Sequence, residues 1–205
     1  MKKILTAIMM VCFAVGCCNN DESSFNIAEG SSIDGLHAPW DGLDDDTVFR
    51  CFCDKDYFYF YYEVTDNSLT LTVPFVKERD VDPEDRVEVF FSPREEMDIY
   101  YCAEIDPIGH IMDYKAKYYR DFDYDWNFAT MEVLTKVEEG KYIVSGKVAK
   151  SELTELGLDL GHFYMGVFRA DFKEDGAVVW YSAIPTEDES PDFHKSNVLF
   201  TASMR

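Results

Sequence analysis

Hydrophobic and polar residues alternate along most of the chain after residue 47, with a period of two. Val87, Val89 and Phe91 fall on one face of such a run, and Arg86 and Glu88 fall on the other. A period of two is typical of β-strands, because successive side chains of a strand point to opposite faces. The pattern therefore predicts a chain built mainly from β-strands.

Two segments give this prediction more detail. Residues 57–62 are aromatic at every position, so we expect a central strand that is covered on both faces. Residues 131–137 and 142–148 both alternate and are joined by Glu139 and Gly140, which predicts a β-hairpin. Turn residues separate the remaining runs at similarly short intervals.

Residues 151–156 form the one segment with a helical pattern, in which Ser151 can act as the N-cap and Gly157 ends the helix. The other runs predict nine or ten strands at short spacing, which is typical of a sandwich. We therefore expect an all-β protein, an antiparallel, jelly-roll-like β-sandwich with one short helix. Its single domain should span residues 27–205.

The first 16 residues have the pattern of a signal peptide. Lys2 and Lys3 precede an apolar stretch that is too short to span a membrane, and Gly16 precedes Cys17. Residues 14–17 resemble the cleavage box of bacterial lipoproteins, in which the cysteine becomes the acylated first residue. We expect a membrane anchor at Cys17; the alternative is secretion without a lipid.

Residues 17–26 are polar and predict a tether between the lipid and the domain. Asp21 and Glu22 follow the cysteine closely, which resembles the surface-export signal of Bacteroidetes lipoproteins. The expected location is the outer membrane, with the domain exposed at the cell surface. The alternative is a domain that faces the periplasm.

Composition narrows the set of ligands. The chain has 205 residues, with 40 Asp and Glu against 19 Lys and Arg, so its formal net charge is −21. Removal of residues 1–16 would delete two lysines and make the charge more negative by two. Such a chain repels nucleic acids and other polyanions, which leaves neutral sugars or a basic partner as candidates.

The cysteines outside the predicted signal peptide indicate neither a zinc site nor a redox motif, since no CxxC pair occurs. Cys51 and Cys53 share one face of a predicted strand and point in parallel, so they are poor disulfide partners. We interpret them as small buried hydrophobic residues.

Two tryptophans are candidates for stacking on a sugar ring. Trp126 lies in the segment 118–127, where aromatic rings stand beside carboxylates, and such a segment can match both the apolar face and the hydroxyl rim of a sugar. Trp180 lies in a predicted strand. The alternatives are that Trp126 plugs the edge of the sandwich and that Trp180 is a core residue.

Three further residues are candidates for hydrogen bonds to a ligand. Arg86 and Arg169 each occur in an otherwise apolar strand, where an arginine is seldom unpaired. Each can donate to ligand hydroxyls or form a salt bridge within the sheet, for instance to Glu88 or Asp171. His194 can donate and accept when neutral, although a lone histidine can also be structural.

Signals for a metal or for catalysis are weak. Asp41, Asp44, Asp45 and Asp46 form an acidic loop that suits calcium, with a solvated loop as the alternative. The sequence contains no GxSxG, HExxH or P-loop motif. No catalytic residue and no cofactor other than calcium is expected, although paired carboxylates at the separation found in glycosidases remain an alternative.

Several segments together resemble one family. They are the early Ile33-Asp34-Gly35, the aromatic strand 57–66, Asp85-Arg86-Val87-Glu88, residues 100–109 and 163–169, the late Trp180, and Pro191-Asp192-Phe193-His194. This order resembles the family 9 carbohydrate-binding modules and their relatives in the DOMON-like β-sandwich group. Those modules have a Trp just before the Asp-x-Val-Glu strand, where this chain has residues 81–84.

The resemblance implies a sandwich that binds sugars, with calcium as a structural aid in some members and glycan-degrading enzymes as usual companions. By motif position it assigns Arg86, Glu88, Trp180, Asp192 and His194 to the sugar site. We therefore expect non-catalytic binding of a neutral oligo- or polysaccharide by a lipoprotein. The alternatives are a small glycoside hydrolase and a protein-interaction subunit of an outer-membrane glycan-uptake complex.

Overall fold

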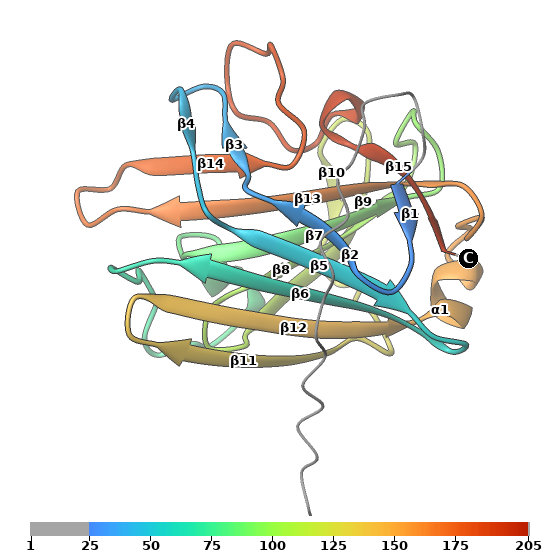
Figure 1. The fold of residues 1–205 in the computed structure, drawn as a ribbon, viewed down its shortest axis with the longest axis horizontal. Helices are drawn as coiled ribbons and strands as arrows, with labels where there is room; N and C mark the ends of the chain where they lie inside the picture. Colours follow the sequence, from blue (N-terminus) through green and yellow to red (C-terminus); the bar gives the residue numbers. More distant parts are fainter. Residues whose placement is uncertain (1–24, 205) are drawn as a thin grey trace, which may run out of the picture.

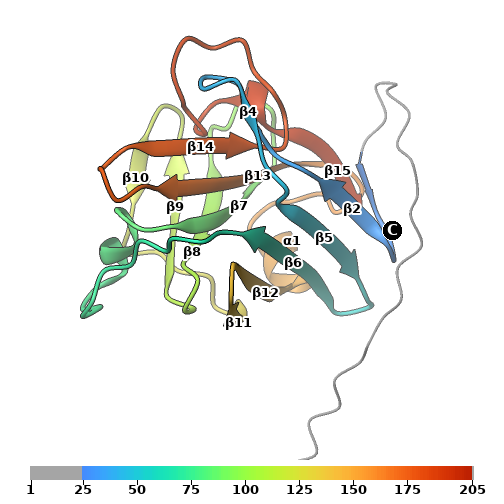
Figure 2. The same ribbon diagram turned by 60° about the vertical axis from the view of Figure 1, so that its left-hand side comes forward.

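Two β-sheets packed face to face make up the protein in a computed structural model that describes residues 25–204 (Figures 1 and 2). Neighbouring strands pair antiparallel in both sheets, apart from the short β1, which runs parallel to β15. The predicted all-β sandwich is confirmed. None of the helices in the described residues is long and apolar enough to cross a membrane.

The large sheet has ten strands. In spatial order they are β10 (Asp121–Asp123), β9 (Ile111–Lys117), β8 (Tyr100–Ile105), β7 (Arg86–Ser92), β13 (Phe163–Phe172), β14 (Val178–Ser182), β3 (His37–Ala38) and β4 (Leu43–Asp44), with β15 (Phe200–Met204) also paired to β13 and β1 (Phe25–Ile27) paired to β15. Strand β1 starts at Phe25, two residues before the predicted start of the domain. The predicted signal peptide (residues 1–16) and the predicted lipidation site Cys17 lie outside the described residues.

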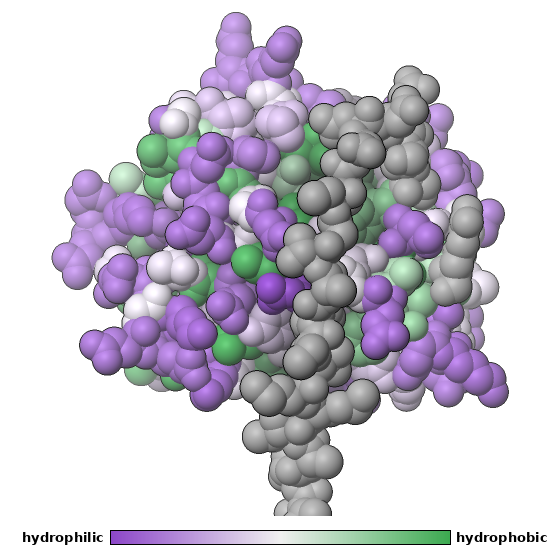
Figure 3. Space-filling model, in the orientation of Figure 1, coloured by the Kyte–Doolittle hydropathy of each residue, from purple (hydrophilic) through white to green (hydrophobic). Residues whose placement is uncertain are grey.

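The small sheet has five strands, in the order β11 (Glu132–Glu138), β12 (Lys141–Ala149), β6 (Tyr57–Thr65), β5 (Val48–Cys53) and β2 (Ser31–Asp34). The predicted hairpin is confirmed, because β11 and β12 pair antiparallel around the turn at Gly140. Figure 3 shows hydrophilic residues over much of the face seen in Figure 1, as expected for a strongly acidic protein.

The main core lies between the sheets. Phe58, Phe60 and Tyr62 of β6 are buried there, and the Tyr62 hydroxyl donates to the backbone oxygen of Glu88, 2.6 Å away in the other sheet. Strand β6 is central, as predicted, but its second face is only half-buried. On that face the side chains pack only beside those of neighbouring strands, as where Phe52 stacks on Tyr59 at 4.6 Å, and they stay partly exposed. The prediction of cover on both faces is therefore wrong.

The strands that are buried on both faces belong to the large sheet. All residues of β7 and β8 are buried, because the outer face of this sheet carries a second hydrophobic cluster. The cluster contains Phe90, Tyr100, Tyr114 and Phe193 among others. This outer cover holds the side chains that form the site described next.

The helix α1 (Lys150–Glu155) follows β12 directly. Both ends of the helix lie within one residue of the predicted range 151–156, and Gly157 (φ +95°) follows the helix. The predicted cap is wrong, because Ala149 takes the N-cap position and Ser151 lies inside the first turn. Two short 3₁₀ helices, η1 (Glu78–Val81) and η2 (Ser196–Val198), precede β7 and β15. Cys51 and Cys102 are buried and, like Cys53, form no disulfide.

Candidate functional site

A pocket of about 470 Å³ opens on the outer face of the large sheet. It brings together five of the seven candidate binding residues, namely Arg86, Glu88, Trp180, Asp192 and His194. Its volume lies within the range of about 300–1,000 Å³ that is usual for small-molecule sites. The pocket is therefore the candidate binding site.

Alternation in β7 explains why two of these residues face the pocket. Val87, Val89 and Phe91 belong to the core between the sheets. Arg86 and Glu88 alternate with them along the strand and therefore point to the opposite face, where the pocket lies. Trp180 comes from β14, which lies two strands away in the same sheet beyond β13. Asp192 and His194 come from the loop that follows β14 and covers this face.

The guanidinium of Arg86 is held by two carboxylates. Its Nε lies 2.9 Å from Glu88 Oε1 and 2.5 Å from Glu104 Oε2, and its Nη1 donates to the backbone oxygen of Asp82 at 2.8 Å. The guanidinium carbon also lies 5.4 Å from the ring centroid of Trp180. Arg86 thus has the in-sheet salt bridge that was one alternative, and it still lines the pocket.

Glu88 and Glu104 lie directly opposite each other on β7 and β8. Burial, and next the negative charge of Glu104, raise the pKa of Glu88 to about 8, and Arg86 opposes this rise. The raised pKa favours the protonated form of Glu88, which can donate a hydrogen bond. Glu88 as a donor and Glu104 as an acceptor would then both be available to a ligand in the pocket.

His194 and Asp192 line the pocket from the loop after β14. His194 Nδ1 lies 2.9 Å from the Tyr100 hydroxyl, and burial lowers the pKa of the imidazole to about 3, so the ring is neutral. Asp192 accepts hydrogen bonds from the Tyr119 hydroxyl at 2.6 Å and from Arg120 Nη2 at 2.8 Å. Because Nδ1 is bonded to Tyr100, Nε2 is left as a single donor or acceptor for a ligand hydroxyl.

Sequence reasoning missed much of the lining of this pocket. Further lining residues are Arg79, Asp82, Glu104, Tyr114, Arg120, Phe122, Tyr124, Pro191 and Phe193. Phe122 and Tyr124 lie in the aromatic and acidic segment 118–127, which also contains Trp126. The segment is therefore a usable signal for the pocket, although Phe122 and Tyr124 line it and Trp126 does not. Arg79 lies in η1 and Asp82 directly follows it, in a stretch of sequence that shows no β alternation.

Trp126 lies away from the pocket and contributes to the main core. Its ring centroid is 5.1 Å from that of Tyr101 and 4.8 Å from that of Phe128. The side chain is partly buried against the hydrophobic residues between the sheets. This position agrees with the alternative that Trp126 plugs the sandwich.

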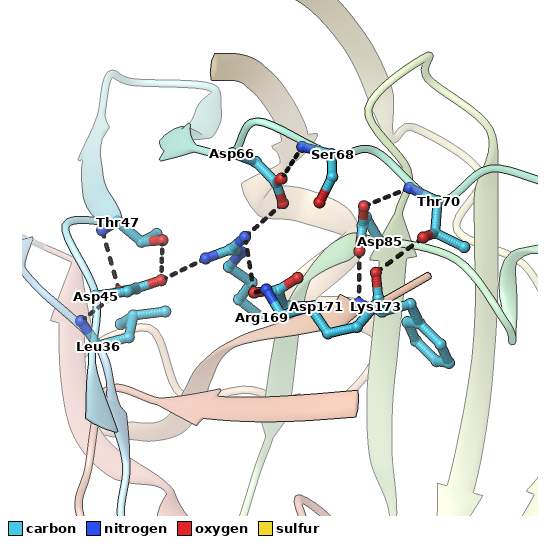
Figure 4. Close-up of polar contacts among 11 residues, drawn as sticks. Leu36, Asp45, Thr47, Asp66, Ser68, Thr70, Asp85, Arg169, Asp171 and Lys173 are labelled. Atoms are coloured by element: carbon cyan, nitrogen blue, oxygen red, sulfur yellow. Dashed lines mark hydrogen bonds and ion pairs between the residues drawn. The ribbon is translucent and has the colours of Figure 1, made fainter. Parts of the chain in front are cut away.

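Arg169 of β13 also lies away from the pocket, in a buried ionic cluster shown in Figure 4. Its Nη1 is 2.9 Å from Asp45 Oδ2, and its Nη2 is 2.7 Å from Asp66 Oδ2 and 3.5 Å from Asp171 Oδ2. The guanidinium is surrounded by carboxylates of its own chain. The contacts agree with the salt-bridge alternative for this residue.

Two carboxylates of the acidic loop, Asp44 and Asp45, contact other groups of the protein. Asp45 accepts hydrogen bonds from the amides of Leu36 and Thr47 and pairs with Arg169, as Figure 4 shows. Asp44 lies 2.6 Å from His37 Nδ1. Within residues 25–204, the groups of acidic and histidine side chains close enough to share an ion lie elsewhere, and calcium binding by this loop stays a prediction.

Comparison with known proteins gives matches in structure. No family model matches the chain, and no curated protein matches it by sequence. A candidate carbohydrate-binding protein from Bacteroides uniformis matches with a TM-score of 0.66 at 16% identity, over 84% of this chain and 85% of that one.

A family 9 carbohydrate-binding module from Caldicellulosiruptor kristjanssonii, solved with cellotriose, matches with a TM-score of 0.54 at 12% identity. The match covers 78% of this chain and 75% of that module. The chain shares its fold with these proteins. The resemblance to family 9 modules that was drawn from the sequence is thus confirmed for the fold.

Proposed function

We propose that this protein binds a neutral oligosaccharide in the pocket on the large sheet and does not modify it. The observation that carries the proposal is the pairing of an aromatic ring, Trp180, with closely spaced donors and acceptors in one pocket. A flat ring matches the apolar face of a sugar, and the polar groups match its hydroxyls. The shared fold with a cellotriose-bound module supports the proposal.

The charges in the pocket support a neutral ligand. Arg79 pairs with Asp82, Arg86 with Glu88 and Glu104, and Arg120 with Asp192. All three guanidinium groups of the pocket are therefore already paired with carboxylates. A sugar that bears a carboxylate or a sulfate would have to break one of these pairs, which costs free energy.

Titration calorimetry with cello-, xylo- and manno-oligosaccharides tests the proposal. We expect Kd values between millimolar and micromolar, since each stacked ring contributes on the order of 1 kcal/mol. Trp180→Ala should weaken binding by about tenfold or more, while Trp126→Phe, which lies outside the pocket, should leave Kd unchanged. Absence of heat with every sugar, or an unchanged Kd in Trp180→Ala, would contradict the proposal.

A glycoside hydrolase is the second candidate, and the raised pKa of Glu88 is the observation that favours it, because a general acid needs such a pKa. However, Glu88 and Glu104 contact the same nitrogen of Arg86, on neighbouring strands. Glycosidases place their two carboxylates on either side of the scissile bond. Reducing ends that are released from a polysaccharide and lost in Glu88→Gln would establish the enzyme instead.

We also propose that Cys17 anchors the protein to the outer membrane, with the sandwich at the cell surface beside glycan-uptake proteins. The support is the sequence pattern of residues 1–26. Labelling of cells with radioactive palmitate should mark the protein, and Cys17→Ser should abolish the label while Cys18→Ser retains it. Digestion by protease added to intact cells would support surface display, and resistance would place the domain in the periplasm.

A further inference from the structure

A second cluster of ligand-type side chains lies at one end of the large sheet, outside the pocket. Asp106 follows the last residue of β8, and Glu84 lies just before β7. Because the two strands pair antiparallel, with Val87 opposite Ile105, these two carboxylates meet at the same end of the sheet. His110 joins them from the far side of the turn that connects β8 and β9 (Ile111–Lys117).

Both carboxylates are completely buried, with exposed fractions of 0%. Glu84 Oε1 accepts the amide of Thr72 at 2.6 Å, but within the described residues no N–H or hydroxyl donates to the buried Glu84 Oε2. Burial, and next the contact with the Asp106 carboxylate, raise the pKa of Glu84, so the two carboxylates compete for a proton or a cation. One ligand atom each from Glu84, Asp106 and His110 lie within 4.8 Å of one another. A buried carboxylate oxygen without a donor beside a second carboxylate is costly, and a bound cation would remove that cost.

Within residues 25–204, no lysine or arginine forms an ion pair with this cluster. The ion pair of Asp106 is with His110, at 2.7 Å from Nδ1, and its other oxygen accepts the amides of Ile108 and His110. The comparable group Asp66, Asp85 and Asp171 differs, because Arg169 and Lys173 enter it (Figure 4). Arg169 and Lys173 therefore supply positive charge to the three aspartates. Within the described residues, no lysine or arginine supplies it to Glu84 and Asp106.

His110 is held in place and is reachable from solvent. Its ring stacks on Phe75 with centroids 3.8 Å apart and planes 6° apart, and its side chain is 28% exposed. An ion can therefore reach the imidazole from outside while both carboxylates stay buried. Calcium and magnesium prefer oxygen ligands throughout, whereas one imidazole with two carboxylates suits zinc and similar divalent ions.

We propose that Glu84, Asp106 and His110 bind one divalent transition-metal ion, for which Zn²⁺ is the probe. The ion would join the segment before β7 to the turn after β8, and so fix one end of the large sheet. Its binding should therefore raise the thermal stability of the protein.

The test uses the purified full chain after removal of metals with EDTA. Calorimetry with Zn²⁺, Mn²⁺, Ca²⁺ and Mg²⁺ should show one Zn²⁺ bound per chain, with a rise in Tm on loading. Glu84→Gln and His110→Phe should each weaken Zn²⁺ binding by more than about tenfold. The second variant keeps a ring against Phe75, so it also serves if Glu84→Gln fails to fold.

His37→Phe is the matched control, since His37 makes a similar contact with Asp44 at 2.6 Å but at an exposed place without a second buried carboxylate. Its Zn²⁺ affinity should equal that of the wild type. Absence of binding by Zn²⁺ and Mn²⁺, binding of Ca²⁺ alone, or loss of binding in His37→Phe but not in His110→Phe would each overturn the proposal.

Discussion

His194 shows how burial sets the chemistry of a single residue. The ring is enclosed by Phe90, Phe122 and Tyr114, with Tyr100 bonded to Nδ1, and this environment disfavours the charged form. Arg120 and Arg86 oppose protonation as well, while Asp192 favours it. The result is a neutral ring with one nitrogen left for a ligand, in a pocket whose other polar groups are mostly ion-paired.

This low pKa makes the stability of the protein depend on pH. In the unfolded chain a histidine binds a proton below about pH 6.5, but His194 in the folded protein remains neutral down to about pH 3. The contribution of His194 to the free energy of unfolding should therefore fall as pH drops from 6.5 towards 3. Urea unfolding at several pH values should show that the free energy of unfolding depends less steeply on pH in His194→Gln than in the wild type. An equal slope in the two proteins would contradict this role of His194.

At the scale of elements, the sequence predicted the periodic segments well and the irregular ones poorly. The hairpin of β11 and β12, the helix α1 and the central place of β6 all follow from local patterns that a reader can count. The contact between Arg120 and Asp192 spans 72 residues. No local pattern encodes that contact, because it forms only when the loop after β14 closes over the sheet.

The position of Trp126 has the same origin. Acids and rings alternate over residues 121–126, so the sequence does not indicate which rings turn inward. The short strand β10 pairs with β9 and directs Phe122 to the pocket side, and the chain then turns so that Trp126 enters the main core. Burial decided the role of each ring, and burial depends on contacts distant in sequence.

A glycine in β12 makes the packing of two elements testable. Gly146 lies opposite Phe60 of β6, and a Cβ built there would lie 2.1 Å from the Phe60 ring. Gly146→Ala should therefore force the ring out of place and lower the free energy of unfolding by about 1–3 kcal/mol. Ser145→Ala, one residue earlier, is the control, and equal urea midpoints for the two variants would show that the ring yields freely.

At the scale of the whole molecule, the acid surplus is the dominant electrostatic feature. A net charge of −21 on 205 residues destabilises the compact state by self-repulsion, which salt screens. Raising NaCl from 10 to 500 mM at pH 7 should therefore raise Tm, by about 2–4 °C for each kcal/mol recovered. The effect should vanish near the sequence pI of about 4.4, and an equal rise at that pH would indicate another cause.

The two faces of the large sheet have separate optical reporters. Trp126 lies in the core between the sheets, whereas Trp40 and Trp180 both contact Phe193 on the outer face, with centroids 6.3 and 5.5 Å away. Fluorescence of Trp126→Phe would thus follow the outer cluster, and that of a Trp40→Phe/Trp180→Phe double variant would follow the main core. Non-coincident unfolding curves would mean that the outer cover of the pocket opens while the sandwich stays folded.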